Sequence, residues 1–286
     1  MSEGREPAAR PGRAKMRRVY RRRRLVALAL AAAIGVGAWA LVSLAGGGSG
    51  EAAPAKTAAE PPATTARLTT SGPATIPAAE PGTAVLITQG PAVQRVALTF
   101  DDGSCAECIR AILKTLERTR TPATIFPNGV YKENWEENLT RLRRLIDAGL
   151  VDVGNHTWAH VDATKQTPAQ LTRDINRVER WIEGSFDVTT RPLFRPPFGQ
   201  YDDSVLETAG KLGYTQVVNW SDGSLDWETQ VPEEIVGHVR DALEPGVIVL
   251  MHANRPGTAE ALPLIVELLA RQGYEPVTLR ALLASG

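Results

Sequence analysis

The sequence is short of cysteine, of histidine and of net charge. Its 286 residues include two cysteines and four histidines, and 32 basic residues balance 32 acidic ones. The balance hides an asymmetry, because residues 1–24 hold ten Lys or Arg and two Glu, leaving 22 basic and 30 acidic residues elsewhere. That remainder carries a formal net charge of −8. An acidic body argues against a general nucleic-acid binder.

Long apolar runs are also scarce, and the prominent one is Leu25 to Ala45, which is 21 residues long without a charge. As a helix it would span about 30 Å, the thickness of a bilayer's hydrocarbon core. Arg21 to Arg24 precede it and no basic residue follows until Lys56. The positive-inside rule then places residues 1–24 in the cytoplasm and everything after Ala45 across the membrane.

A cleaved signal peptide is the alternative interpretation of this apolar run. The apolar region of a signal peptide is usually about 7–15 residues long, so the length favours an uncleaved transmembrane signal anchor over residues 25–45. Both interpretations place the body outside the cytoplasm. No cysteine follows the run before Cys105, so the sequence shows no lipoprotein signal.

Residues 46–83 are rich in Ala, Pro, Gly and Thr, which predicts a disordered or extended linker. From residue 84, short apolar runs alternate with segments whose apolar residues recur at helical spacing. After a short strand at Val85–Ile87, seven such β/α units predict one α/β domain over residues 84–286, with a parallel sheet that is open or closed into a barrel. The expected strands are Arg95–Phe100, Ala123–Pro127, Val151–Asn155, Pro192–Arg195, Thr215–Trp220, Val247–His252 and Tyr274–Thr278. The expected helices are Glu107–Thr119, Asn134–Ala148, Pro168–Glu183, Asp202–Leu212, Pro232–Leu243 and Thr258–Gln272.

The first long strand delivers two adjacent carboxylates, Asp101 and Asp102, and then Gly103. Carboxylates at the end of a buried strand are costly unless a metal, a cation or a reaction uses them. The alternative is a common Asp-Asp-Gly turn that caps the next helix. Taken alone, this stretch favours the turn.

Polar and aromatic groups also follow four later strands. Parallel strands bring their carboxyl ends to one edge, where α/β folds build their sites. Three of the four histidines fall at this edge, which shifts the balance from the turn to a functional site. The groups concerned are Asn155-His156 with His160, Arg195 to Gly199, Asp226-Trp227 and His252.

The segment His156-Thr157-Trp158-Ala159-His160 places its histidines at i and i+4. One helical turn would bring both onto one face, close enough to share a metal ion. Thr157 stands where the metalloprotease motif HExxH has Glu, so that motif is excluded. With a carboxylate from Asp101 or Asp102, two histidines would make a hydrolytic metal site. For an isolated HxxxH, capping or core histidines would be the favoured alternative.

Together these motifs resemble the polysaccharide deacetylase family, also called the NodB-homology family or carbohydrate esterase family 4. The resemblance covers about residues 93–283, and order and spacing both match. The family's fold is a distorted (β/α) barrel. The motifs are TFDDG at Thr99–Gly103, HTWAH at His156–His160, RPPFG at Arg195–Gly199, DW at Asp226-Trp227 and LMH at Leu250–His252.

The resemblance implies a role for each matching residue. Asp102, His156 and His160 would bind a divalent metal, commonly zinc, with cobalt or manganese as alternatives. Asp101 would be the general base, and Arg195 would hold it in place and keep it ionised. His252 would be the general acid, with Asp226 hydrogen-bonded to its ring. The substrate contacts would be the backbone N–H of Phe198 for the oxyanion and the side chains of Trp227 and Leu250 for the acetyl methyl group.

The residues themselves add two expectations. Tyr201, near the site, is a candidate for contact with a sugar ring. Cys105 and Cys108 begin the helix after the aspartates, and outside the cytoplasm their spacing favours a local disulfide that braces the turn. Ser104 replaces the proline that often follows TFDDG, and residues 123–129 depart from the family's usual apolar segment. Neither departure removes a catalytic group.

The sequence therefore predicts a membrane-anchored, extracytoplasmic hydrolase that removes N-acetyl groups from the amino sugars of a polysaccharide. Topology alone points to peptidoglycan in a cell wall as the substrate. Chitin oligomers, an O-acetylated glycan, and a non-catalytic glycan-binding protein on the same fold remain alternatives. The expected partners are the N-acetylated glycan and the membrane. Nucleic acid is not expected, and the sequence predicts no protein partner.

Overall fold

The structure is a computed structural model that describes residues 82–285. The expected cytoplasmic tail, the signal-anchor helix and nearly all of the linker lie outside the described residues. Within residues 82–285, no helix combines the length and the apolar character needed to cross a membrane. The α/β domain expected from residue 84 onward falls within this described part.

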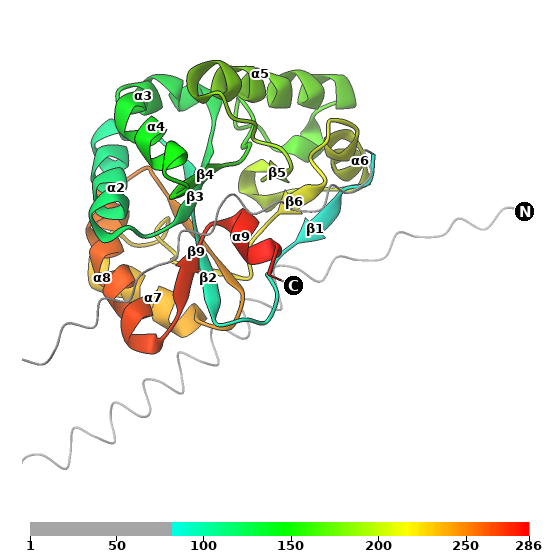
Figure 1. Cartoon of the computed structure of the whole chain (residues 1–286). Coiled ribbons are helices and arrows are strands. Elements are labelled where there is room, and N and C mark those ends of the chain that lie inside the picture. The colour runs from blue at the N-terminus through cyan, green and yellow to red at the C-terminus, as the bar shows by residue number, and fades with distance from the viewer. Residues whose placement is uncertain (1–81, 286) are drawn as a thin grey trace, which may run out of the picture. The chain divides into compact units, whose positions relative to one another are not determined.

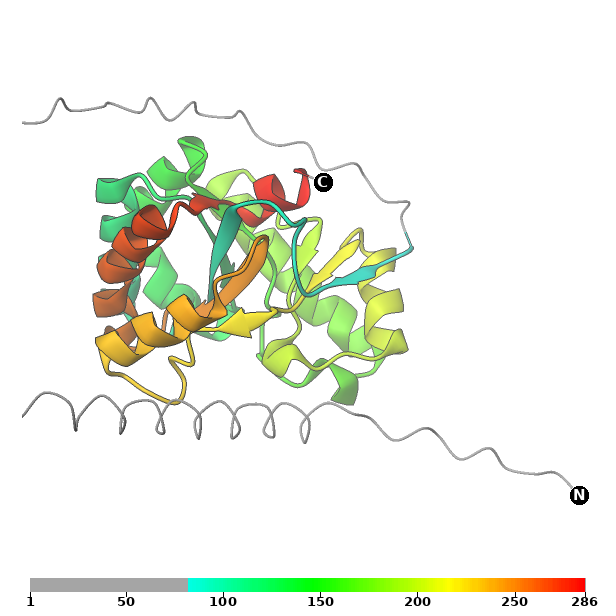
Figure 2. The same ribbon diagram turned by 90° about the horizontal axis from the view of Figure 1, so that it is seen from below.

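The described strands form two parallel sheets (Figures 1 and 2). A single bridge between Asn155 and Phe194 joins them, and every strand pairing is parallel. The larger sheet has the order β4-β3-β2-β8-β7, with β9 paired to the first half of β2. The smaller sheet has the order β1-β6-β5. The bounds are β1 Val85–Ile87, β2 Arg95–Asp102, β3 Ala123–Pro127, β4 Val151–Val153, β5 Leu193–Phe194, β6 Gln216–Val218, β7 Asp222–Gly223, β8 Val247–His252 and β9 Glu275–Val277.

The expected α/β class and parallel strands are confirmed, in the form of an open half-barrel. Among residues 82–285 no pairing joins β1 to β7, so the strands do not close into a complete barrel. β2 also runs two residues further than expected, because Asp101 and Asp102 continue the ladder with β3 and Asp101 pairs with His252 of β8. Both carboxylates therefore belong to the strand, and the chain turns only at the last strand residue, Asp102.

Most helices follow the expected apolar spacing. One expected helix, residues 134–148, is instead two helices, α3 and α4. The side-chain amide of Asn138 donates to the backbone oxygens of Ala106 and Asn134, which competes with helical pairing at the break. The bounds are α2 Ala106–Thr119, α3 Lys132–Glu136, α4 Leu139–Asp147, α5 Pro168–Phe186, α6 Asp203–Lys211, α7 Pro232–Ala242, α8 Pro256–Gln272 and α9 Leu279–Leu283.

Strand β2 holds the core together because both of its faces are buried. Val96, Leu98 and Phe100 pack in one cluster with residues of α2 and α8. Ala97 faces a second cluster, to which both sheets and α9 contribute Phe126, Val218 and Leu282. Strands buried on both faces read as continuous apolar runs, which is why the segment before Asp101 lacks alternation. The rigid strand fixes where its two terminal carboxylates lie.

Candidate active site

Asp101 is held by a buried arginine. Nη1 of Arg195 lies 2.8 Å from Oδ1 of Asp101 and 2.8 Å from Oγ1 of Thr99, and the guanidinium stacks 4.3 Å from the centroid of the Phe126 ring. Arg195 has 0% of its surface exposed. A charge buried this completely is stable only when paired and hydrogen-bonded, and Asp101 supplies the pairing charge. Arg195 thereby fixes the position of the Asp101 carboxylate.

Asp102, the next residue, shares His156 with Asp101, whose Oδ2 lies 3.7 Å from Nε2 of His156, but it does not contact Arg195 in the described structure. Its φ of 71° turns the chain out of the strand. Nε2 of His160 lies 3.1 Å from its Oδ1, and Nε2 of His156 lies 3.6 Å from the same atom. Burial raises the pKa of the Asp102 carboxyl, but the rings of His156, His160 and His252 and the hydrogen bond from Asn254 together offset this and bring it below its ordinary value.

The two histidines do not lie on a helix, so the expected helical turn is wrong. The segment is a loop in which Thr157 has φ 64° and His160 has φ 53°. Oδ1 of Asn155 accepts a hydrogen bond from the N–H of Thr157 at 3.0 Å, which supports the first of these left-handed residues. The loop places the two imidazole centroids 5.0 Å apart. The two rings therefore lie close together, as expected, but turns of the loop backbone bring them there and a helix does not.

The residues at this point fit a divalent cation. One donor atom from each of Asp102, His156 and His160 lies within 4.8 Å of the others. Nδ1 of His156 lies 2.7 Å from the backbone oxygen of Arg195, which can only accept, so Nδ1 carries the hydrogen and Nε2 keeps its lone pair for a metal. Burial, followed by the nearby His156, lowers the pKa of His160 and favours the neutral imidazole that ligates metals. Two imidazoles and one carboxylate form a donor set used in hydrolytic metal sites.

His252 and Asp226 form a second unit on the opposite side of Asp101. Nδ1 of His252 lies 2.8 Å from Oδ1 of Asp226, and Oδ2 of Asp226 accepts from the His252 backbone N–H and from Thr258 at 2.7 Å each. Burial lowers the pKa of His252, but the hydrogen bond and charge of Asp226 outweigh it and raise the pKa to about 8. The imidazolium is therefore the prevailing form at neutral pH, which suits a proton donor.

The four residues expected to contact the substrate differ in how close they lie to these groups. Phe198 has φ 59°, and its ring packs edge-on to His160 with the centroids 4.7 Å apart. Its backbone N–H has no hydrogen-bond partner among residues 82–285. The Trp227 ring packs edge-on to His252 at 5.7 Å, while Leu250 is buried in β8. Tyr201 is 38% exposed, and within the described part of the chain no hydrogen bond or ring contact joins it to the metal-site residues.

Cys105 and Cys108 form a disulfide in the structure. Cys105 is also the N-cap of α2, where its sulfur accepts from the backbone N–H of Cys108. The bridge therefore sits at the start of the helix that directly follows the turn at Gly103. Asp102, a site residue, directly precedes Gly103 in this turn.

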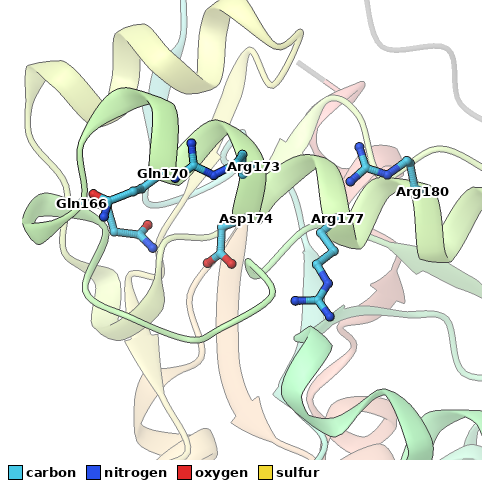
Figure 3. A pocket seen from close by; sticks show the side chains of 6 residues that line it. All are labelled: Gln166, Gln170, Arg173, Asp174, Arg177 and Arg180. Atoms are coloured by element: carbon cyan, nitrogen blue, oxygen red, sulfur yellow. The ribbon is translucent and has the colours of Figure 1, made fainter.

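Several side chains that support the site were not expected from the sequence. On α5, Asp174 accepts from the backbone N–H of Ala159, and the guanidinium of Arg177 lies 3.7 Å from the centroid of the Trp158 ring. Figure 3 shows these two side chains on the same side of α5, in a hollow with Arg173 and Arg180. The hollow includes no metal-site residue, but two of its lining residues, Asp174 and Arg177, contact the loop that carries His156 and His160.

Comparison with known proteins gives concordant results. The polysaccharide deacetylase family profile matches residues 89–217. A chitooligosaccharide deacetylase from Bradyrhizobium sp. (strain ANU 289) is 32% identical over 194 residues, covering 63% of this chain and 86% of that protein. A peptidoglycan-N-acetylglucosamine deacetylase from Bacillus cereus is 33% identical over 196 residues, covering 66% and 87%. Among solved structures, a mutant of a CE4 family pseudoenzyme from Bacillus anthracis, with restored enzymatic activity, has a TM-score of 0.63 at 30% identity and covers 70% of this chain and 72% of that one.

Proposed function

Because this chain belongs to the polysaccharide deacetylase family, we propose that it is a metal-dependent hydrolase that removes N-acetyl groups from the amino sugars of an extracytoplasmic polysaccharide. One observation carries the proposal. Asp101 and Asp102 are adjacent in sequence, but Arg195 binds only Asp101 and His160 approaches Asp102, while His156 lies 3.7 Å from Asp101 and 3.6 Å from Asp102. Asp101 can therefore accept a proton while the neighbouring Asp102 helps to bind a cation.

The metal site would consist of Asp102, His156 and His160, with zinc as the proposed ion. When bound there, a divalent ion supplies Lewis acidity that polarises the acetyl carbonyl and makes water at the site more acidic. The donor set does not discriminate among zinc, cobalt and manganese by itself, since imidazole and carboxylate ligands suit several of these ions.

The protein's own groups perform the proton transfers. Asp101 takes a proton from the attacking water, and Arg195 keeps the carboxylate aimed at it. The N–H of Phe198 would donate to the oxyanion as the carbonyl carbon becomes tetrahedral. His252, charged at neutral pH through Asp226, gives its proton to the departing sugar nitrogen as the C–N bond breaks. The products are the free amino sugar and acetate.

The exposed aromatic groups around these residues support a glycan as the substrate. Phe198 and Trp227 are 61% and 43% exposed, yet the first contacts His160 and the second His252. Aromatic faces exposed to solvent at a site offer apolar surface on which a sugar ring can stack. Trp227 and Leu250 would enclose the acetyl methyl group, and Tyr201 would contact a neighbouring sugar unit.

For the polymer, we propose peptidoglycan. The sequence expectation of a signal anchor at residues 25–45 would place the enzyme outside the cytoplasm, next to a cell wall. The relative from Bacillus cereus is named for peptidoglycan N-acetylglucosamine, and the relative from Bradyrhizobium for chitooligosaccharides. Both names are compatible with N-acetylated amino sugars as the reacting unit.

The fold alone does not imply activity, since one structural relative is a pseudoenzyme. The intact set of Asp101, the three proposed ligands and His252 supports catalysis in this chain. Incubation of the full-length protein and zinc with peptidoglycan fragments and, separately, with N-acetylglucosamine oligomers tests it, with mass spectrometry and acetate release as readouts. We expect products one acetyl group lighter, and faster turnover of the peptidoglycan fragments. Absence of acetate from both substrates with zinc, cobalt or manganese present would contradict the proposal.

A further inference from the structure

Both oxygens of the Asp102 carboxylate are already bound by side-chain amides. Nδ2 of Asn128 donates to Oδ1 at 2.8 Å, and Nδ2 of Asn254 donates to Oδ2 at 2.8 Å. Asn128 follows β3 and Asn254 follows β8, and these strands flank β2 on its two sides. The carboxylate is therefore held from both neighbouring strands.

Asn128 also belongs to a segment that holds the histidine loop. The N–H of Gly129 donates to the backbone oxygen of Thr157 at 3.2 Å, and that of Val130 donates to the oxygen of Trp158 at 2.9 Å. Gly129 lies against the Trp158 ring so closely that an added Cβ would come within 2.0 Å of it. One short segment thus fixes Asp102 and the loop that carries both histidines.

The buried amide of Asn128 leaves one polar atom without a hydrogen bond among residues 82–285, and an apolar residue at this position would avoid that. The residue is 0% exposed, and its Oδ1 has no hydrogen-bond partner within the described residues. A buried carbonyl oxygen without a hydrogen bond destabilises the folded protein. Reversing the amide would set its oxygen against the Asp102 carboxylate, so the orientation is fixed by the donor. The one hydrogen bond that this side chain makes within the described part of the chain is the bond to Asp102.

Asn254 makes a more complete set of bonds. Its Oδ1 accepts from the backbone N–H groups of Gly103 at 3.1 Å and Ser104 at 2.9 Å, while its Nδ2 donates to Asp102. It lies two residues after His252, so it ties the strand that carries the proton donor to the turn after the metal carboxylate. Any rotation of Asp102 would break bonds on both strands.

We propose that Asn128 and Asn254 are positioning residues that orient the Asp102 carboxylate for the divalent cation, an inference that rests on the proposed metal-dependent function. An ionised carboxylate has about four acceptor positions, and the two amides occupy one on each oxygen. The remaining lone pairs are left for the cation and cannot rotate away from it. Hydrogen bonds of this kind to a metal ligand typically change metal affinity by about 10–100-fold.

The test compares zinc affinity between two variants and two matched controls in the full-length protein. Asn128→Leu keeps the volume and removes the donor, and Asn254→Ala removes the second donor. The first control is Asn134→Ala, because Asn134 donates to the backbone oxygen of Gly103 but not to Asp102. The second is Asn138→Ala, a buried asparagine that bonds only backbone oxygens.

The zinc dissociation constant is measured by competition with a chromophoric chelator, after circular dichroism has established that each variant is folded. We expect a constant about 10–100-fold higher for Asn128→Leu and for Asn254→Ala, and within about twofold of wild type for both controls. The visible spectrum of the cobalt-substituted protein should change in the two variants and not in the controls. If one variant fails to fold, the other decides.

Wild-type affinity in both variants, or an equal loss of affinity in Asn134→Ala, would overturn the inference. The readout needs no substrate, so the inference and the proposed function fail separately. A wild-type protein that binds zinc but releases no acetate would contradict the deacetylase proposal and leave the asparagine result standing.

Discussion

Replacing Asp226 by Asn should remove the proton donor from the working pH range. In the structure Asp226 binds His252 twice, through the ring Nδ1 at 2.8 Å and through the backbone N–H at 2.7 Å. Asparagine has nearly the same shape but no charge. Its amide can also face Nδ1 with a donor, which favours the wrong tautomer of the imidazole.

The size of the effect follows from the pKa of His252. Burial alone would place this pKa below the ordinary 6.5, and Asp226 is the largest factor that raises it, to about 8. The rise is about 1.5 pKa units, or about 2 kcal/mol in favour of the imidazolium. At pH 8 half of His252 is charged in the wild type. A return to the ordinary pKa of 6.5 in Asp226→Asn would leave about 3% charged. The expected loss of rate at pH 8 is therefore about 15-fold or more.

The assay is the pH profile of kcat/KM for acetate release between pH 5 and 9, with zinc held constant. We expect the alkaline limb of Asp226→Asn to move down by at least about 1.5 units, while the acidic limb stays in place. The matched control is Thr258→Ala, which removes one hydrogen bond to Asp226 but keeps its charge, so its alkaline limb should stay near the wild-type position. An alkaline limb that does not move in Asp226→Asn would refute the role assigned to the pair.

Three further predictions concern the turn, the fold and the metal. Gly103→Ala should lower the melting temperature strongly, because Gly103 has φ 120° and an added Cβ would lie 2.1 Å from the Trp135 indole nitrogen. The control is Gly184→Ala, at a position of α5 where an added Cβ meets no atom within 4 Å. Its free energy of unfolding should be unchanged or higher by up to about 1 kcal/mol. The metal-free protein should lose stability as pH rises, because the folded pKa of His252 is raised from 6.5 to about 8. That contribution of about 2 kcal/mol is complete below pH 6.5 and lost as pH passes 8, and urea unfolding with chelator at several pH values measures it. Chelation should abolish acetate release and zinc should restore it; activity that persists after complete chelation contradicts metal dependence.

The fold was predictable from the sequence to the extent that local apolar patterns determine it. β3 and β8 have the expected bounds, and α2 starts within one residue of expectation. The open half-barrel was not predictable in this detail, because strand pairing between distant segments leaves no local signal. The break between α3 and α4 depends on where the Asn138 side chain finds backbone oxygens, which only the tertiary structure shows.

The site, too, was predictable in part from the sequence. The motifs led to the groups that the structure brings together, since parallel strands must deliver their ends to one edge. The helical turn expected for His156 and His160 was wrong because spacing of four residues is also met by a loop with left-handed residues. Asn128 and Asn254 also follow strand ends, at β3 and β8, so the rule that led to Asp101 and His252 would have included them. Their bonds to Asp102 could not be read from the sequence.

The division of labour between Asp101 and Asp102 is the central claim, and paired substitutions to asparagine test it most directly. Zinc affinity and acetate release are measured on the full-length Asp101→Asn and Asp102→Asn proteins. Asp101→Asn should bind zinc within a few-fold of wild type and lose at least about 100-fold in kcat, the range associated with a general base. Asp102→Asn should lose tight zinc binding and activity together. Wild-type turnover by Asp101→Asn with zinc bound, or wild-type zinc affinity in Asp102→Asn, would contradict the account.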